Sequence, residues 1–427
     1  MKKLTVLLLL AALSLQLFAC TAARPDTPDP SQATNQTPGQ TNGAEPASPT
    51  GLSAAALSGE GTPAPVDGSF AAASANFAVE LLKNTVKSGE NAILSPYSVL
   101  TALAMTANGA DGETRAQMEA AFGLSIDKLN AYLLTCAQNA SEEFSSANAI
   151  WLRDGLEVSE SFLQTDRDYY ASDVHTAAFD EETCRAINEF VKKNTQGRIE
   201  KILEEINPNA VMYLVNALAF TAKWNAEYTT DDVHPETFHG ADGDVQAELM
   251  YSTEHQYLSD ENTTGFLKSY RNTRFCYVAL LPAEGTSLDD YIASLTGEKL
   301  NALMQNVSNE RVNAVMPKFK AEYSTELSTA LQAMGMTDAF GDKADFSRMS
   351  PQAQESGLCI GSVLHKTFLQ VNETGTEAAA ATAVEVMEST AIQPQKPKTV
   401  RVDRPFVCGI YDTESQTFLF LGAVYNV

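Results

Sequence analysis

Long apolar runs along the chain predict a core that contains both helices and strands. Ser95 followed by Pro96 is a typical helix start, and residues 97–107 are apolar on nearly every side, which indicates an interior helix. Residues 210–224 form a continuous apolar run with aromatic and β-branched members, typical of a central strand covered on both faces. Residues 363–371 have the pattern of a second strand.

Four polar residues interrupt these apolar runs. Ser95 and Ser98 lie at the start of the predicted interior helix, Asn216 lies within the first predicted strand, and His365 lies within the second. A buried polar side chain without a hydrogen bond costs about 1–3 kcal/mol. We therefore expect each of the four to have a partner, and they could be one another's partners.

Residues 376–387 combine small side chains with a strict separation of charge. Alternate residues of an extended strand face opposite sides. One side would carry Thr376, Ala378, Ala380, Thr382, Val384 and Val386, and the other Glu377, Ala379, Ala381, Ala383, Glu385 and Met387. The first set has no charge, so a strand here could turn it towards a core, with Gly375 as a flexible hinge.

A helix is the alternative for this segment, because Ala and Glu favour helices. Such a helix would have no substantial apolar stripe, and a short free helix is marginally stable in water. The segment could therefore be helical in one state of the protein and a strand in another.

The N-terminus has the features of an export signal. Lys2 and Lys3 precede the apolar stretch Leu4–Phe18, which is too short for a typical membrane-spanning helix and suits a signal peptide. The following "LFAC" is similar to a bacterial lipobox, so residues 1–20 are predicted to be a signal peptide that ends at Cys20, the site of lipid attachment. The alternative is an ordinary signal peptide with Cys20 incidental. We expect an exported protein, either lipid-anchored at the cell surface or secreted.

Residues 21–68 differ in composition from the rest of the chain. Pro, Gly, Ser, Thr, Ala, Gln and Asn dominate, and the only larger aliphatic residues are Leu52, Leu57 and Val66. Such a segment buries too little apolar surface to offset the entropy of ordering it. We predict a disordered tether over residues 21–68 and one folded domain over residues 69–427.

Charge and motif content exclude several classes of function. The chain has 54 acidic and 29 basic residues and a net charge of −25, which disfavours nucleic acid and anionic membrane surfaces as partners. The only membrane contact we expect is through the N-terminal lipid. The sequence has no HExxH, GxSxG, Walker or GxGxxG motif, so we expect no metal and no cofactor.

Two weaker features allow other interpretations. "SIDK" (Ser125–Lys128) with "SAN" (Ser146–Asn148) matches the first two motifs of penicillin-binding enzymes, but no KTG motif follows. The five cysteines after Cys20 have no CxxC spacing and an odd number, which favours buried thiols over a complete disulfide framework. They are Cys136, Cys184, Cys276, Cys359 and Cys408.

Five stretches together resemble the serpin family, in the family's order and over residues 69–427. They are "NAILSPYSVLTALAMTANGADGET", "LVNALAFTAKW", "VMPKFKAEYSTELSTALQAMGMTDAF", "VLHKTFLQVNETGTEAAAATAV" and "RPFVCGIYDTESQTFLFLGAVYNV". The resemblance implies an α+β serpin fold: a large central, mostly antiparallel sheet, further sheets, helices packed around them and an exposed reactive loop. It also implies a monomer without catalytic residues of its own.

The resemblance assigns roles to particular residues. The reactive bond would be Ser389–Thr390, with Met387–Glu388 and Thr390–Ala391 as alternative registers. A network of Ser95, Ser98, Asn216 and His365 would close the central sheet at its midpoint. Insertion would begin near Trp224, Lys318 and Glu373, with Glu373 paired to Lys318. The loop hinge would consist of Gly375, Thr376, Glu377, Ala378, Ala379, Ala380, Ala381 and Thr382.

The resemblance also implies a partner and a mechanism. A serine protease would attack the reactive bond and form a covalent acyl complex, and the loop would then insert into the central sheet. Small side chains near the bond suit elastase-like or subtilisin-like proteases, whereas no Lys or Arg precedes it to suit trypsin-like ones. The alternative function is a non-inhibitory serpin that acts as a surface binding module.

A group of basic residues follows the predicted loop. Lys396, Lys398, Arg401 and Arg404 lie close together in the sequence. A solvated face is the simpler interpretation, and an additional contact surface for an acidic protease is the alternative.

Overall fold

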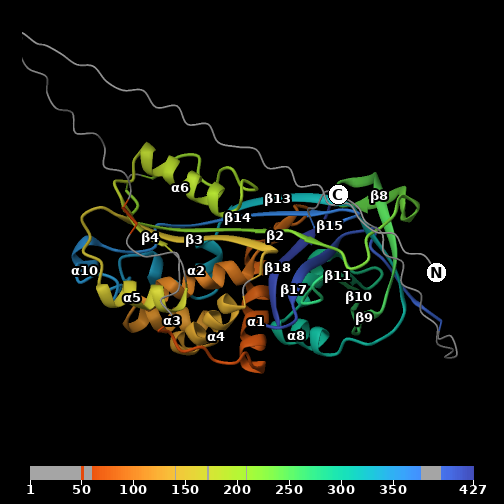
Figure 1. The fold of residues 1–427 in the computed structure, drawn as a ribbon, viewed down its shortest axis with the longest axis horizontal. Helices are drawn as coiled ribbons and strands as arrows, with labels where there is room; N and C mark the ends of the chain where they lie inside the picture. The colour runs from red at the N-terminus through yellow and green to blue at the C-terminus, as the bar shows by residue number, and fades with distance from the viewer. Residues whose placement is uncertain (1–49, 52–59, 140, 171–172, 208, 377–395) are drawn as a thin grey trace, which may run out of the picture. The chain divides into compact units, whose positions relative to one another are not determined.

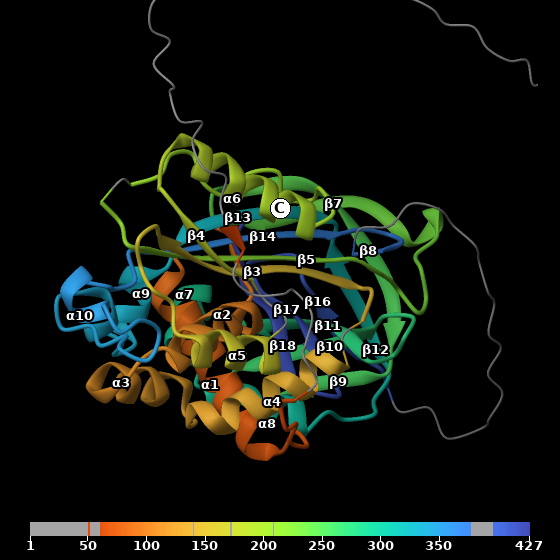
Figure 2. The same ribbon diagram turned by 60° about the vertical axis from the view of Figure 1, so that its left-hand side comes forward.

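The computed structural model describes residues 50–51, 60–139, 141–170, 173–207, 209–376 and 396–427. Within these residues, helices are packed around several β-sheets (Figure 1). The largest sheet lies between α6 on one side and α2–α5 on the other, and Figure 2 shows the same layers from a second direction.

Eight strands of the described residues form the central sheet, in the order β1-β4-β3-β5-β14-β15-β6, with β13 paired to β14. Most neighbouring pairs are antiparallel, whereas β3 with β4 and β5 with β14 are parallel. The predicted α+β fold with a large, mostly antiparallel central sheet is confirmed. The strands are β1 (Thr50–Gly51), β3 (Phe144–Arg153), β4 (Asp173–Ala177), β5 (Met212–Phe220), β6 (Ala222–Lys223), β13 (Phe319–Glu326), β14 (Ser362–Val371) and β15 (Gly375–Thr376).

Two further sheets complete the β-structure of the described residues. The six-stranded sheet has the order β2-β18-β17-β11-β10-β9, and the four-stranded sheet has the order β16-β12-β8-β7. The six-stranded sheet consists of β2 (Ala92–Leu94), β9 (Gln256–Ser259), β10 (Thr263–Ser269), β11 (Phe275–Pro282), β17 (Phe406–Asp412) and β18 (Thr417–Val424). The four-stranded sheet consists of β7 (Val233–Gly240), β8 (Gly243–Glu254), β12 (Val312–Pro317) and β16 (Lys398–Arg401).

The longer helices are α1 (Gly68–Thr85), α2 (Pro96–Asn108), α3 (Gly112–Phe122), α4 (Ile126–Gln138), α5 (Glu160–Tyr169) and α6 (Glu181–Asn194). Shorter helical segments are α7 (Leu288–Ser294), α8 (Gly297–Gln305), α9 (Ser328–Ala333), α10 (Ala353–Ser356) and two 3-10 turns, η1 (Thr230–Asp232) and η2 (Asp338–Phe340). No helix among the described residues is both long and apolar enough to cross a bilayer.

The predicted interior helix is confirmed as α2. The Ser95 hydroxyl accepts a hydrogen bond from the Ser98 amide at 3.3 Å, and Pro96 occupies the first helical position. Nearly all of its residues are buried, as the apolar pattern requires. The helix is therefore fixed inside the molecule, and Ser98 is held in its first turn.

The predicted central strand is confirmed as β5, in which every residue is buried. Tyr213, Val215 and Ala217 pack in the same apolar cluster as Ile187 and Val191 of α6. The alternate residues of β5 pack into apolar clusters on the opposite face. Coverage on both faces explains why the sequence shows a continuous apolar run rather than an alternating one.

Part of the predicted tether contacts the helical layer of the protein. The Ala64 amide donates to the Ala131 carbonyl at 3.1 Å, the Thr135 hydroxyl donates to the Ala64 carbonyl at 2.7 Å, and Val66 packs against the main core. Ala64 thus lies against α4, within the segment predicted to be a tether. Two backbone contacts and one aliphatic side chain hold a segment whose average composition suggests disorder.

The five cysteines after Cys20 are free thiols, as predicted. Cys136, Cys184, Cys276 and Cys408 are buried, and Cys359 is half-buried. Burial raises the pKa of Cys136, Cys276 and Cys408 to about 12, which disfavours the reactive thiolate. These residues therefore act as small apolar core members.

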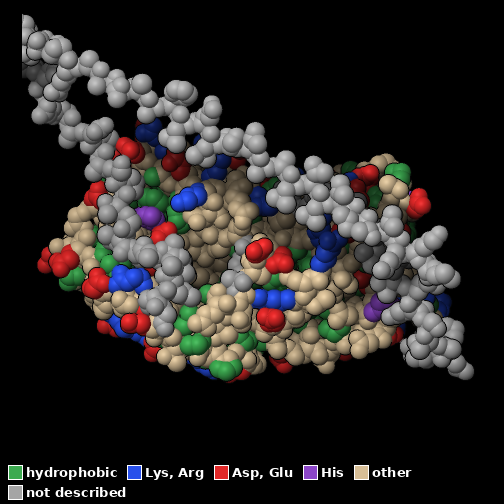
Figure 3. All heavy atoms as spheres, viewed as in Figure 1, with side chains coloured by type: hydrophobic (Ala, Val, Ile, Leu, Met, Phe, Trp, Pro, Cys, Tyr) green, Lys and Arg blue, Asp and Glu red, His purple; other side chains and the backbone are tan. Residues whose placement is uncertain are grey.

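The described surface offers few apolar side chains. Charged side chains of both signs are spread over the face shown in Figure 3, with hydrophobic side chains between them. Among the described residues, the only large hydrophobic side chains classed as exposed are Val245 and Val427.

Candidate functional site

Asn216 and His365 lie side by side where β5 and β14 pair in the middle of the central sheet. The His365 Nδ1–H donates to the Asn216 Oδ1 at 2.5 Å, and His365 Nε2 accepts from the Ser95 amide at 3.1 Å. Both side chains are fully buried. The imidazole thus joins β14 to β5 and to the start of α2.

Ser98 extends these contacts to a third strand. The Asn216 amide group donates to the Ser98 hydroxyl, and the Ser98 hydroxyl donates to Asn148 Oδ1 at 3.1 Å. Asn216 also donates to Asn148 Oδ1 at 2.7 Å. The structure therefore brings Ser95, Ser98, Asn216 and His365 together, and we call them, with Asn148, the closing network.

Asn148 was not singled out from the sequence. It lies in β3 directly opposite Asn216, and its neighbours Ala147 and Ala149 are buried. The sequence interpretation considered it only as part of the "SAN" motif. A polar residue between two alanines could have indicated it. Ala147 and Ala149 pack on the α6 side, so strand alternation turns Asn148 towards α2 on the other face.

Burial lowers the pKa of His365 to about 3. The ring is therefore neutral above that pH, which matches its contacts: one nitrogen donates and the other accepts. Protonation would remove the acceptor for the Ser95 amide and place a charge in the core.

This pKa shift predicts a loss of stability in acid. An unfolded histidine titrates near 6.5, so between pH 6.5 and about 3 the unfolded chain binds the proton that buried His365 excludes. The contribution is complete above pH 6.5 and should fall by about 3 kcal/mol on going to pH 4.5. Urea unfolding at pH 7.0, 5.5 and 4.5 would measure it.

His365→Asn should have a flatter dependence of unfolding free energy on pH than the parent over this range. His175, whose pKa burial lowers to about 4, adds a pH dependence of the same sign but is present in both proteins, so the difference between them reports His365. Equal pH slopes for the parent and His365→Asn would contradict the assignment.

The residues predicted to start insertion also lie together, around the end of β14. The Trp224 indole N–H donates to the Asn372 carbonyl at 2.8 Å, and the Trp224 amide donates to the Thr374 carbonyl at 3.0 Å. Lys318 lies 2.8 Å from Glu373 Oε1 and 3.0 Å from Glu248 Oε2. The hydrogen bond to Glu373 raises the pKa of Lys318, so the pair stays charged.

The hinge begins with a tight turn back into the central sheet. Asn372 Oδ1 accepts from the amides of Thr374 at 3.0 Å and Gly375 at 3.1 Å. A Cβ on Gly375 would lie 2.1 Å from the Ala222 carbonyl oxygen, so only glycine fits there. The chain then passes between two strands in a space that admits no side chain at this position.

Thr376 already occupies a place in the central sheet. As part of β15 it pairs with Val371 of β14 on one side and with Ala222 of β6 on the other, and its side chain is fully buried. It faces inward, on the side that alternation assigns to the uncharged set. The other predicted hinge residues, Glu377, Ala378, Ala379, Ala380, Ala381 and Thr382, lie outside the described residues, as do Ser389, Thr390 and Cys20.

Beyond β15 no strand of the described residues lies between β5 and β14. β5 and β14 pair directly from Tyr213 with Ser362 to Ala219 with Phe368. A further strand can enter here only if these hydrogen bonds and the closing network separate.

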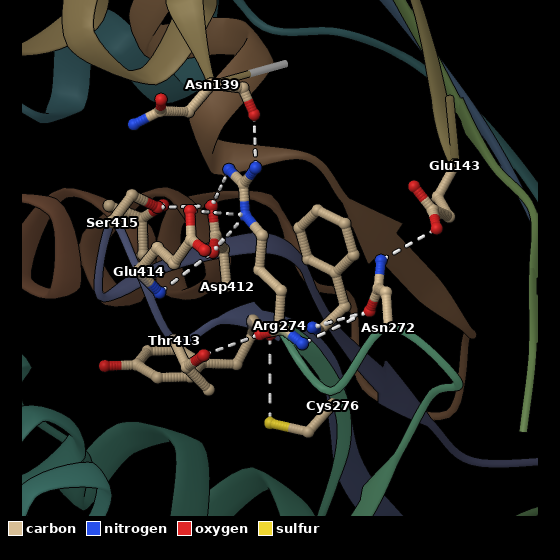
Figure 4. Close-up of polar contacts among 12 residues, drawn as sticks. Asn139, Glu143, Asn272, Arg274, Cys276, Asp412, Thr413, Glu414 and Ser415 are labelled. Atoms are coloured by element: carbon tan, nitrogen blue, oxygen red, sulfur yellow. Dashed lines mark hydrogen bonds and ion pairs between the residues drawn. The ribbon is translucent and has the colours of Figure 1, made fainter. Parts of the chain in front are cut away.

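A polar cluster fastens the end of the central sheet to the six-stranded sheet (Figure 4). Arg274 makes two hydrogen bonds to Asp412, at 2.6 and 2.9 Å, and donates to the Asn139 carbonyl. Next to it, Asn272 donates to the Glu143 carboxylate at 2.7 Å, immediately before β3. Asn139 and Asp412 are each more than a hundred positions from Arg274, so no local pattern predicts this cluster.

The alternative acyl-transfer site is not formed. Lys128 donates to the Ser69 hydroxyl at 2.6 Å and lies 3.9 Å from Asp67, at the start of α1. Ser125 is the N-cap residue of α4. The "SIDK" match therefore falls at the start of α4, where Lys128 contacts the start of α1.

Three of the four basic residues after the predicted loop have an acidic or carbonyl partner. Lys398 lies 3.4 Å from Glu310, and Arg404 donates to the Pro282 carbonyl at 2.9 Å. Arg401 pairs with Glu236 and Asp403. These contacts favour the simpler interpretation of a solvated face.

Comparisons with known proteins agree with this geometry. The family model described as "Serpin (serine protease inhibitor)" matches residues 72–427. An uncharacterised serpin-like protein from Thermococcus kodakarensis is 32% identical over 363 residues, which cover 82% of this chain and 84% of that protein. The corticosteroid-binding globulin of Bos taurus is 29% identical and covers 82% of this chain and 89% of the globulin.

A solved structure is similar over the same region. The native state of tengpin, a thermophilic serpin, has a TM-score of 0.82 and 40% sequence identity, and the match covers 89% of this chain and 100% of tengpin's. Sequence and fold therefore point to the same family.

Proposed function

The chain belongs to the serpin family, whose members are generally protease inhibitors rather than catalysts, and from this premise we propose that it is a suicide-substrate inhibitor of serine endopeptidases. The observation that carries the proposal is the position of the hinge. Gly375 and Thr376 already form a strand in the central sheet, and the segment that follows is small-sided and uncharged on one face. A cut beyond the hinge would free that segment to continue the strand.

In the proposed mechanism the protease supplies the catalytic residues. Its serine attacks the carbonyl of Ser389, forms an acyl-enzyme and releases Thr390 as the new N-terminus. The freed segment then separates β5 from β14 and inserts between them, carrying the attached protease with it. Because small displacements of catalytic groups cost orders of magnitude in rate, the displaced protease fails to hydrolyse the ester.

The proposed targets are elastase-like or subtilisin-like enzymes. Val386, Met387, Ser389 and Ala391 surround the proposed bond, and these side chains are small or medium in size. Pockets that accept such residues are shallow and apolar rather than acidic. The proposed location is outside the cytoplasm, either secreted or attached to a membrane through lipid on Cys20.

A non-inhibitory binding function is the second candidate. It is supported by the similarity to corticosteroid-binding globulin, a serpin relative named for a bound ligand. The uncharged inward set of residues 376–386 favours inhibition, since a carrier needs no insertable loop.

Incubation with elastase or subtilisin, followed by denaturing electrophoresis, separates the two functions. We expect a band at the summed mass of protease and cleaved inhibitor that survives boiling in detergent. The matched control is the same protease with its catalytic serine blocked by phenylmethylsulfonyl fluoride, which should give no such band. Complete cleavage in the loop without a covalent band would favour the binding function.

A further inference from the structure

Thr376, one of the described hinge residues, makes a contact that reaches outside the central sheet. The hydroxyl groups of Tyr270 and Thr376 share a hydrogen bond of 2.7 Å, and both residues are fully buried. Tyr270 directly follows β10, at the edge of the turn that leads to β11. This bond therefore ties Thr376 to the end of β10 in the six-stranded sheet.

The tyrosine ring is held on two sides. It stacks on the Trp224 indole with centroids 4.5 Å apart and planes within 14°, and Phe220 meets its edge at 5.1 Å. The backbone is fixed as well, because the Tyr270 amide donates to the Phe275 carbonyl at 3.0 Å. A ring clamped in this way presents its hydroxyl at a defined point.

The hydroxyl stays protonated under ordinary conditions. Burial raises the pKa of Tyr270 well above its usual range, so the group remains a neutral donor and acceptor. Thr376 is likewise neutral. The bond is thus independent of pH across the range in which proteases act.

We propose that Tyr270 is a positioning residue for inhibition, whose hydroxyl keeps Thr376 in the central sheet before the loop is cut. This inference rests on the proposed inhibitory function. The first residues of a new strand lose conformational entropy and form few backbone hydrogen bonds. Each residue that extends an existing strand adds to a ladder of hydrogen bonds that is already aligned. With Thr376 in place, the cut loop extends an existing strand and inserts before the acyl-enzyme is hydrolysed.

The two hydroxyls can be removed separately without changing side-chain shape. Tyr270→Phe keeps the ring on Trp224, and Thr376→Val keeps the β-branched form. Each single variant should raise the stoichiometry of inhibition, the moles of inhibitor consumed per mole of protease inactivated, by roughly two- to tenfold. The double variant should equal the more affected single variant, because both changes remove the same bond.

Tyr277→Phe is the matched control. Tyr277 contacts the same indole edge-on at 6.0 Å, but within the described residues no hydrogen bond joins it to Thr376. This variant should leave the stoichiometry unchanged, and all variants should be cleaved by the protease at the parental rate. An unchanged stoichiometry in Tyr270→Phe, or additive effects in the double variant, would overturn the proposal.

A second measurement does not depend on inhibition. Hydrogen–deuterium exchange of the peptide containing Gly375 and Thr376 should speed up severalfold in Tyr270→Phe and stay parental in Tyr277→Phe. If the parent forms no covalent complex with any protease, the proposed function fails, but this exchange rate still tests whether the Tyr270 hydroxyl holds Thr376 in the sheet. Equal exchange rates of this peptide in Tyr270→Phe and the parent would show that the Tyr270 hydroxyl does not hold Thr376 in place.

Discussion

Replacing Thr376 by arginine is expected to convert the protein from an inhibitor into a substrate. Thr376 is fully buried between Val371 and Ala222, and alternation requires the same inward facing after insertion. An arginine there would place an unpaired charge in the core, at a cost of about 3–5 kcal/mol. Insertion would slow while hydrolysis of the acyl-enzyme continues, so covalent complex should fall by about a hundredfold or more.

Glu377→Arg is the matched control for this prediction. The sequence assigns Glu377 to the opposite face of the strand, so a change of charge sign there should leave inhibition nearly intact. Denaturing electrophoresis of both variants with one protease gives the comparison. Full inhibition by Thr376→Arg would show that the proposed facing of the loop is wrong.

Local sequence signals were sufficient for the elements that carry the site. The cap at Ser95 and the apolar surroundings of Ser98 predict α2, and the run around Asn216 predicts β5. These signals work because helix caps and full burial leave their mark within a few neighbouring residues. The resemblance to serpins then indicated which buried polar groups belong together.

Contacts between distant segments could not be predicted in the same way. Tyr270 and Thr376 are 106 positions apart, and Asn148 reaches Asn216 across 68 positions. The residue pattern of one segment does not indicate which distant segment it will contact. Such pairs depend on how the sheets pack, which single-residue patterns do not encode.

The contacts that Ala64 and Val66 make with the folded part could not be predicted from composition either. Composition over residues 21–68 describes the average of the segment, whereas Ala64 and Val66 are held by specific contacts with α4. A short stretch at the end of a low-complexity segment can be ordered by the surface that it meets. The boundary is therefore a tertiary property.

The central claim is that the intact chain is held short of its most stable arrangement. In the proposed mechanism, the closed pairing of β5 with β14 and the closing network keep the central sheet from accepting another strand. A cut in the loop should allow insertion, which adds backbone hydrogen bonds on both sides of the new strand and buries its uncharged face.

Calorimetry of the intact and nicked proteins tests this claim most directly. The loop is cut with a catalytic amount of a protease that does not form the complex, and the two samples are heated under the same buffer and scan rate. We expect the nicked form to unfold at least about 20 °C higher than the intact form. Equal unfolding temperatures would show that no stability is gained on cleavage, and the inhibitory mechanism would have to be abandoned.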